Sequence, residues 1–233
     1  MAKHVAIVLS AGRGSRMNTD VAKQYLILQG VPVICHTLKA FEESKIDEVI
    51  LVTAACDAAL VKADIVEKYG FSKVKKIVAG GAERVDSVYE GLKAADADYI
   101  HIHDGARCLI TPELIERMMS GAEKYKAAVM AVPAKDTIRQ ADAEGYGEKC
   151  LDRSILWAMQ TPQSFEYTLI RAAFDKMYAT DGPVKITDDV MVLEQYGNKS
   201  ARLVEGSYEN LKITTPEDLI MAQAILDNRA QEF

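Results

Sequence analysis

The sequence predicts an α/β protein with a three-layer, doubly wound, mostly parallel sheet, and three observations lead to it. Short apolar runs alternate with segments of helical periodicity along most of the 233 residues. The first run, Val5–Leu9, is rich in β-branched residues and free of charge, as expected of a strand buried on both faces. A glycine-rich turn, Ser10–Met17, follows at once. We expect a single domain over residues 1–233, because this length supports one α/β core.

Composition excludes several classes of protein. Hydrophobic residues make up 49% and charged residues 27% of the chain, which is ordinary for a soluble domain. The net charge of −6 argues against a nucleic-acid partner, which would need clustered Lys and Arg. No apolar run approaches the roughly 20 residues that span a bilayer, so we expect no membrane partner and a cytoplasmic location. Four widely spaced cysteines are expected to be buried small hydrophobes rather than a zinc or disulfide site: Cys35, Cys56, Cys108 and Cys150.

The first two thirds of the chain show regular strand–helix alternation. Gln29–Gly30 predicts a turn between two short extended segments. Further strands are predicted at Glu48–Thr53, Lys73–Ala79, Tyr99–His103 and Ala127–Val132. Helices are predicted at Ile34–Glu43, at Asp57–Tyr69 with Leu60, Val61, Ile65 and Val66 inward, at Glu83–Ala94, and after the capping pair Thr111–Pro112.

The alternation stops between Ala134 and Gln160. Thr137–Ala141 and Lys149–Leu151 predict two strands around a glycine-rich bend. An isolated hairpin is marginal in water, so a protruding arm at about 135–156 is expected to form a subunit contact. An ordinary edge hairpin is the alternative.

The remaining third is predicted as a loop, helices and one strand. Thr161–Phe165 is expected to be a rigid loop before a helix at Glu166–Tyr178. Thr187 is expected to cap a second helix. A strand is predicted at Ala201–Gly206, and Thr215–Pro216 is expected to open the last helix.

Four polar sets follow predicted strands, at the sheet edge where open α/β proteins bind ligands. They are the glycine turn with Arg16 and Lys23, the pair Gly80–Gly81 with Ser87, Asp104 with Arg107, and Lys212. Glycines let a backbone approach a ligand closely, and fixed cations beside them suit a polyphosphate. The glycine spacing matches neither the Walker A loop nor the full dinucleotide fingerprint.

Acidic and histidine residues offer one candidate metal ligand. A lone aspartate after a strand is often a helix cap, but Asp104 ends an apolar strand next to Gly105, on the edge where a phosphate-bound Mg²⁺ would lie. His101 and His103 lack a third ligand of known spacing, so they are expected to be core residues. Asp188–Asp189 is also compatible with simple helix N-terminal charge, and Asp152–Arg153 with a surface ion pair.

A series of motifs, in order from about Val5 to Ile225, carries a family resemblance. The motifs are Ser10-Ala11-Gly12-x-Gly14-x-Arg16-Met17, Lys23-Gln24-Tyr25, Gly80-Gly81-x-Glu83-Arg84-x-Asp86-Ser87-Val88, His103-Asp104-x-Ala106-Arg107, Val132-Pro133-x-Lys135-Asp136-Thr137-Ile138, Asp152-Arg153-x-x-Leu156-Trp157, Thr161-Pro162-Gln163, Ile186-Thr187-Asp188 and Val204-Glu205-Gly206. Together they closely resemble the 2-C-methyl-D-erythritol 4-phosphate cytidylyltransferases of the non-mevalonate isoprenoid pathway.

The resemblance implies a Rossmann-like nucleotidyltransferase that joins CTP and methylerythritol phosphate into the CDP-alcohol and releases pyrophosphate, with Mg²⁺ as cofactor. It also implies a homodimer, because the arm of one subunit would complete the site of the other. The implied roles are catalysis for Arg16, Lys23 and Lys212; nucleotide binding for Ala11, Gly12, Gly14, Gly81, Ser87 and Arg107; acceptor binding for Thr161, Thr187 and the arm residue Arg153; and metal binding for Asp104.

Three positions depart from the family pattern. Ala22 stands where proline usually precedes the lysine, Ala82 where an aspartate often contacts the base, and Cys108 where proline follows the arginine. None of them removes a charge that the chemistry needs. A ribitol- or glycerol-type polyol phosphate cytidylyltransferase is the near alternative. A nucleotide-binding module without catalysis is the remote one, although binding alone would not require all the charged residues.

Overall fold

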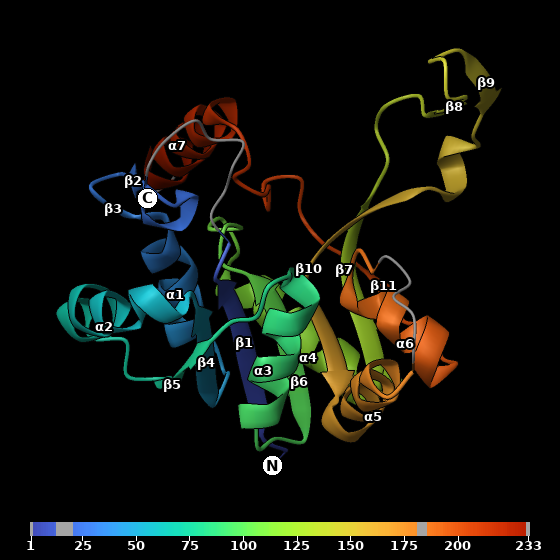
Figure 1. The fold of residues 1–233 in the computed structure, drawn as a ribbon. Helices are drawn as coiled ribbons and strands as arrows, with labels where there is room; N and C mark the ends of the chain where they lie inside the picture. The colour runs from blue at the N-terminus through green and yellow to red at the C-terminus, as the bar shows by residue number, and fades with distance from the viewer. Residues whose placement is uncertain (1, 13–20, 181–185, 232–233) are drawn as a thin grey trace.

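The computed structural model describes residues 2–12, 21–180 and 186–231. Within these ranges a 7-stranded sheet has the order β11-β7-β10-β6-β1-β4-β5 (Figure 1). Its strands are β1 (His4–Ser10), β4 (Glu48–Thr53), β5 (Val74–Ala79), β6 (Tyr99–Asp104), β7 (Ala127–Pro133), β10 (Trp157–Glu166) and β11 (Arg202–Glu205). Only β10 runs antiparallel to its neighbours in this described sheet. The predicted doubly wound, mostly parallel α/β fold is confirmed.

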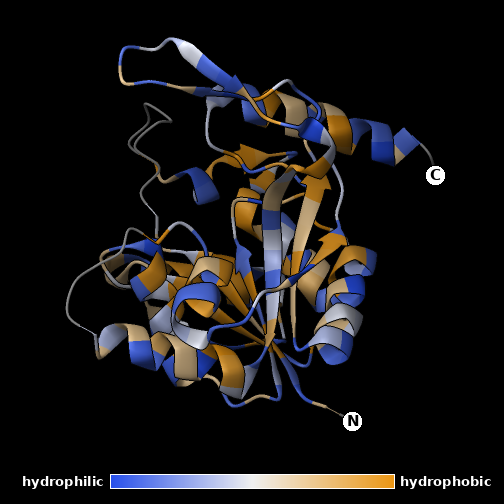
Figure 2. Cartoon of the chain, turned by 90° about the vertical axis from the view of Figure 1, so that its right-hand side faces the viewer, coloured by the Kyte–Doolittle hydropathy of each residue, from blue (hydrophilic) through white to orange (hydrophobic). Residues whose placement is uncertain are grey.

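Helices cover both faces of the sheet. On one face lie α1 (Val33–Glu43), the continuous helical stretch of α2 (Ala58–Leu60) and the π-helical η4 (Val61–Glu67), and α4 (Pro112–Tyr125). On the other face lie α3 (Arg84–Ala94), α5 (Tyr167–Tyr178) and α6 (Asp189–Gly197). Figure 2 shows the apolar strands between these two polar-surfaced layers.

The central strand β1 is buried on both faces of the sheet, which explains why its apolar run carries no charge. Ala6 and Val8 pack into the core on the α1 side, whereas Val5 and Ile7 pack into the core on the α3 side. All four are fully buried. Burial of a Val or Ile side chain contributes about 1.5–3 kcal/mol, so a polar residue at any of these positions would weaken the centre of the sheet.

A small third cluster lies beyond the carboxyl end of the sheet. The hairpin of β2 (Ile27–Leu28) and β3 (Val31–Pro32) turns at Gln29 and Gly30, both at positive φ, as the sequence predicted. The last helix, α7 (Pro216–Gln231), lies on this hairpin, with Ala222 buried between them (Figure 1). Short 3₁₀ turns outside the arm include η2 (Lys23–Tyr25) and η3 (Ala55–Asp57).

The loop predicted at Thr161–Phe165 is wrong, because these residues belong to β10. This strand lies between β6 and β7 and carries a register shift between Met159 and Gln163, where Pro162 is accommodated. Its polar side chains are buried but find partners, as when Gln163 Oε1 accepts a hydrogen bond from the Asp189 amide at 2.9 Å. Polar residues and a proline do not show the alternation that identifies a strand from sequence.

Three smaller predictions also need correction. The cap of α6 is Asp188, whose side chain accepts a hydrogen bond from the Met191 amide, and not Thr187. Leu60 is exposed rather than inward. Cys56 and Cys150 are exposed, whereas Cys35 and Cys108 are buried as predicted. The cap at Thr111 lies where the sequence predicted it.

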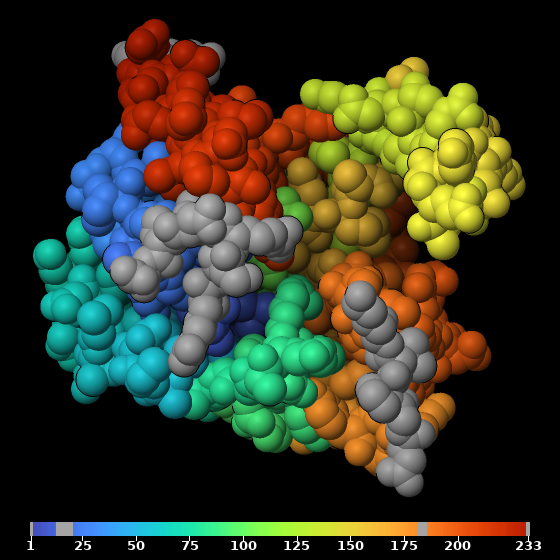
Figure 3. All heavy atoms as spheres, turned by 45° about the horizontal axis from the view of Figure 1, so that its top comes forward, coloured from blue at the N-terminus to red at the C-terminus, as the bar shows by residue number. Residues whose placement is uncertain are grey.

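The predicted hairpin arm is present. It consists of β8 (Arg139–Ala141), β9 (Gly147–Cys150) and the 3₁₀ turn η5 (Arg153–Ile155), and β8 and β9 pair only with each other among the described strands. Residues 135–150 are all exposed. The space-filling view shows the arm, in yellow, as a lobe at the edge of the molecule (Figure 3).

Across the residues that the structure describes, none of the helices has the length and apolar character needed to cross a membrane.

Candidate active site

A pocket of about 200 Å³ lies at the carboxyl ends of β1 and β6. The strand order changes direction at β1, so this is the switch point at which open α/β sheets bind ligands. The pocket brings together seven of the predicted site residues: Ala11, Gly12, Lys23, Gly81, Ser87, Asp104 and Lys212. These residues come from four separate parts of the chain, and only the fold makes them neighbours.

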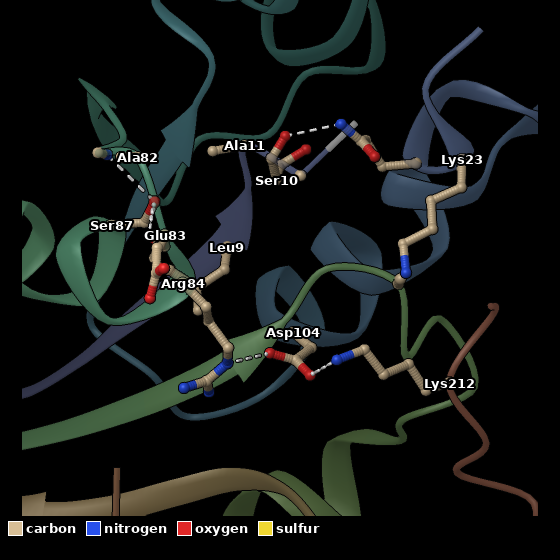
Figure 4. Close-up of a pocket in the computed structure, with 14 residues that line it drawn as sticks. Leu9, Ser10, Ala11, Lys23, Ala82, Glu83, Arg84, Ser87, Asp104 and Lys212 are labelled. Carbon is tan, nitrogen blue, oxygen red and sulfur yellow. Dashed lines mark hydrogen bonds and ion pairs between the residues drawn. The ribbon is translucent and has the colours of Figure 1, made fainter. Parts of the chain in front are cut away.

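Asp104, the last residue of β6, is the negative centre of the pocket (Figure 4). Arg84 donates from Nε to its Oδ1 at 3.0 Å, and Lys212 Nζ lies 2.7 Å from its Oδ2. Burial alone would raise the pKa of this carboxyl, but Arg84 and Lys212 outweigh burial and hold its pKa well below the usual range. Asp104 is therefore ionised at neutral pH.

Arg84 is a site residue that sequence reasoning missed. Its two terminal nitrogens donate to both carboxylate oxygens of Asp189, at 3.0 and 2.8 Å, while Nε holds Asp104. Asp189 lies in the first turn of α6, as the sequence allowed, but it is also fully buried and bound to Arg84. Burial raises the pKa of Asp189, and the bidentate contact with Arg84 opposes that rise. The sequence signal that could have identified Arg84 was its position close to the glycine pair Gly80–Gly81. No residue near Arg84 in the sequence indicated that its partner is Asp189.

The turn that carries Lys23 is fixed at two points. Gln24 is buried and donates from Nε2 to the Ser10 carbonyl at 2.8 Å, and Lys23 Nζ donates to the Ile213 carbonyl at 2.9 Å. Ala22 has φ −60°, the value that the family's usual proline would impose. The departure at Ala22 therefore leaves the backbone conformation that the proline would fix.

The glycine pair lets backbone pass close to the pocket. A Cβ on Gly81 would lie 2.3 Å from Asp86 Cβ, and one on Gly80 would lie 2.7 Å from Ser87 Oγ. Ser87 Oγ accepts from the Gly81 amide at 3.2 Å and donates to the Glu83 carbonyl at 3.1 Å. Ser87 thus fixes the segment that lines the pocket opposite Ala11 and Gly12.

The structure places four predicted residues outside the pocket lining. Arg107 donates to the carbonyls of Asn210 and Met159 at 2.8 and 3.3 Å. Thr161 is buried, and its hydroxyl accepts from the Asp104 amide at 3.1 Å. Thr187 is exposed just before α6, and Arg153 lies on the arm, where it donates to the Lys135 carbonyl at 2.6 Å. Arg16 and Gly14 lie outside the described residues. The binding and catalytic roles of all six stay predictions.

The two histidines of β6 are core residues, as the sequence predicted. His101 contacts Ser164 Oγ at 2.8 Å and His4 at 3.0 Å, and burial lowers its pKa to about 3. Burial lowers the pKa of His103 to about 4. Both are neutral at pH 7 and occupied by hydrogen bonds. The described residues contain no group of three or more His, Cys, Asp or Glu that could hold a metal ion.

The pocket nevertheless fits a metal that arrives with phosphates. Mg²⁺ at nucleotide sites takes one or two protein carboxylates, and phosphates and waters complete its shell. Asp104 supplies one ionised carboxylate at the pocket, with lone pairs left beside its contacts with Arg84 and Lys212. A single carboxylate suits a cation that also binds the phosphates of a nucleotide. It does not suit a cation that is coordinated by protein ligands alone.

Known proteins share both the sequence and this fold. A family model described as 2-C-methyl-D-erythritol 4-phosphate cytidylyltransferase matches residues 4–228. Curated relatives of that name from Clostridium acetobutylicum and Lachnoclostridium phytofermentans are 46% identical over 223 residues and 44% identical over 227 residues. These alignments cover 95% and 97% of this chain, and 96% and 97% of the relatives.

A solved structure agrees with the family match. The 4-diphosphocytidyl-2C-methyl-D-erythritol synthase from Anaerococcus prevotii superposes with a TM-score of 0.85 at 35% identity, over 97% of this chain and 96% of that one. A family model that matches nearly the whole chain, relatives above 40% identity and a common fold lead to one conclusion. The chain belongs to the 2-C-methyl-D-erythritol 4-phosphate cytidylyltransferase family.

Proposed function

We propose that this protein transfers the cytidylyl group of CTP to 2-C-methyl-D-erythritol 4-phosphate, forming 4-diphosphocytidyl-2-C-methyl-D-erythritol and pyrophosphate. Family membership supports the reaction and favours this acceptor over ribitol phosphate. One structural observation carries the proposal. A single pocket places glycine-lined backbone beside Lys23, Lys212 and the ionised Asp104.

The reaction is an in-line displacement at the α-phosphorus. A phosphate oxygen of the acceptor forms the new P–O bond, and the bond to pyrophosphate breaks. Such a step depends on positioning and on stabilisation of the charge on the phosphoryl oxygens more than on proton transfer. Lys23 and Lys212 supply two fixed cations for this charge. Arg16, which the family resemblance implies as a third, lies outside the described residues.

The nucleotide would lie along the backbone of Ala11, Gly12 and Gly81. Gly80 and Gly81 lack the Cβ atoms that would push the chain off Ser87 and Asp86, so amide groups can approach a ligand closely. Asp104 would hold Mg²⁺, which when bound neutralises phosphate charge. This family role for Asp104 agrees with its ionised state at the pocket.

The acceptor phosphate would be held by Thr161, Thr187 and Arg153 from the arm of a second subunit. Support for a homodimer comes from the arm itself: Ile138, Tyr146 and Ile155 on it are exposed, which favours burial against another chain. Arg153 also lies on the arm rather than in the pocket of its own chain. We further propose a cytoplasmic location, as the sequence analysis predicted.

Pyrophosphate release with CTP and Mg²⁺ tests the proposal. We expect release with methylerythritol phosphate, far less with ribitol 5-phosphate, and none after chelation of Mg²⁺ with EDTA. Release with ribitol 5-phosphate alone would establish the polyol alternative. CTP binding without turnover on either acceptor would establish the non-catalytic module.

A further inference from the structure

Lys212 lies in a segment without regular secondary structure. Residues 206–215, between β11 and α7, form neither helix nor strand. Even so, Lys212 Nζ is directed at Asp104 at 2.7 Å (Figure 4). A cation that must meet a phosphate within a fraction of an ångström needs a fixed backbone, so contacts outside the pocket must hold this segment.

Two anchors flank Lys212. On its C-terminal side, the Ile213 amide donates to the Ala106 carbonyl at 2.8 Å, and the Ile213 carbonyl accepts from Lys23 at 2.9 Å. On its N-terminal side, two positions away, lies Asn210, which is fully buried. Only Leu211 separates Asn210 from Lys212, so a displacement of Asn210 would move the backbone of Lys212.

Asn210 is fixed through both its side chain and its main chain. Its Nδ2 donates to the Thr161 carbonyl in β10 at 2.9 Å. Its own carbonyl accepts from Arg107 Nη1 at 2.8 Å, and Arg107 Nη2 donates to the Met159 carbonyl at 3.3 Å. Arg107 and Asn210 thereby connect the irregular part of β10 to the segment that carries Lys212.

Stability alone does not explain a buried amide at this position. Asn210 Oδ1 is buried and has no hydrogen-bond partner among the described residues. A half-satisfied buried amide is less favourable than an apolar side chain of similar shape. The donor side of Asn210 therefore serves a purpose that an apolar residue could not, namely the bond to the Thr161 carbonyl.

We propose that Asn210 is a positioning residue that, together with Arg107, holds Lys212 at Asp104 and the reacting phosphates. The placement of Lys212 is a statement about the free protein, whereas its consequence for turnover rests on the proposed function. Arg107 then acts through Asn210 and Lys212 rather than by contact with the nucleotide.

The first experiment measures the placement of Lys212 by NMR and does not depend on catalytic activity. The amine resonance of Lys212 is followed by NMR in protein labelled with ¹⁵N-lysine and assigned by its loss in Lys212→Arg. In Asn210→Ala we expect it to shift to the position of an exposed lysine. The matched control is Ser44→Ala, which removes a buried hydroxyl that donates to the Phe41 carbonyl at 2.9 Å, outside the pocket. An unchanged resonance in Asn210→Ala would overturn the proposal.

The second experiment is a double-mutant cycle in turnover. Asn210→Ala should lower kcat on the order of 10–100-fold, as expected for a misplaced catalytic group, with KM for CTP within about twofold of wild type. In the Lys212→Ala background, Asn210→Ala should lower kcat less than about twofold, because the lysine that Asn210 positions is absent. An equal loss in both backgrounds would contradict action through Lys212.

Arg107→Lys keeps the inference testable if Asn210→Ala does not fold. Lysine keeps the charge but cannot reach both carbonyls, so we expect a lower kcat with an unchanged KM for CTP. A raised KM for CTP with normal kcat would mean that Arg107 contacts the nucleotide instead. If wild type transfers no cytidylyl group, the proposed function fails, whereas the lysine resonance still decides the placement of Lys212.

Discussion

Asp104 shows how single residues set the chemistry of the pocket. It is 8% exposed and would be costly to ionise alone, yet Arg84 and Lys212 keep its pKa below the usual range. Asp189 in turn holds Arg84 through two hydrogen bonds. The four groups alternate in sign, so the pocket has a fixed charge pattern before a ligand arrives.

Lys23 should contribute to turnover more than to binding. Lys23→Ala removes a cation of the pocket that we propose stabilises the transferred phosphoryl group, and loss of one transition-state donor typically costs on the order of 10²–10³-fold in kcat. Steady-state kinetics should show this loss with a small change in KM for CTP. Lys39→Ala, which removes an exposed lysine in a surface pair with Glu43, is the control. Normal turnover in Lys23→Ala would exclude its catalytic role.

Gly81 should be intolerant of a side chain. In Gly81→Ala the new Cβ would meet Asp86 Cβ at 2.3 Å, so either Asp86 or the Gly81 backbone that lines the pocket must shift. Overpacking of this kind costs about 1–3 kcal/mol, and we expect CTP affinity to fall on the order of tenfold, measured by calorimetry. In Gly147→Ala, on the arm, the nearest atom belongs to the flexible Arg139 side chain, and CTP affinity should stay unchanged. Equal affinities in both variants would count against the proposed nucleotide site.

At the scale of elements, β10 and the arm determine which predicted acceptor-binding residues lie near the pocket of their own chain. β10 enters between β6 and β7 and brings Thr161 to the Asp104 amide. The arm leaves the sheet before β10 and carries Arg153 away from its own pocket. An element with few contacts of its own, such as the β8–β9 hairpin, gains stability only against a further surface.

Arg153 should contribute to binding of the acceptor and not to binding of CTP. We expect Arg153→Ala to raise KM for methylerythritol phosphate at least several-fold and to leave KM for CTP nearly unchanged, because the arm is predicted to reach the acceptor phosphate of a second subunit. Arg139→Ala, an exposed arginine on the same arm, is the matched control. Analytical ultracentrifugation gives a second check, since a fully active monomer at micromolar concentration would rule out a shared site.

At the scale of the whole molecule, the buried polar groups of the sheet make folding depend on pH. His101 and His103 lie at the centre of the sheet with no exposed area, and burial lowers their pKa values from 6.5 to about 3 and about 4. Both therefore fold as neutral rings. Between these values and 6.5 the unfolded chain binds more protons than the folded one.

Stability should consequently fall as the pH drops from about 6.5 toward 4. Each buried histidine contributes a slope of at most about 1.4 kcal/mol per pH unit, and the full contribution is present above pH 6.5. Urea unfolding at a series of pH values between 7.5 and 4.5 measures the effect. His101→Gln should show a shallower dependence than wild type. A free energy of unfolding that is constant or rises toward pH 4.5 would contradict this account.

Sequence and structure agree best where the information is local. The apolar β1 and the Gln29–Gly30 turn follow from patterns only a few residues long. The motif series identified the family before the fold was known, since it preserves residue types at fixed spacing. The same patterns misassigned β10 and the cap of α6, because Pro162 and the buried polar residues obey tertiary contacts rather than local periodicity.

By itself, then, the sequence determined the fold class, the family and half of the 14 residues that line the pocket, because strand hydrophobicity and motif spacing are properties of short stretches of chain. Only the tertiary structure decided that Arg84 binds Asp189, 105 positions away, and that Asn210 anchors the segment of Lys212 to β10. Those pairings depend on the order of strands in the sheet. Contacts between distant residues form only once the sheet has brought their strand ends together.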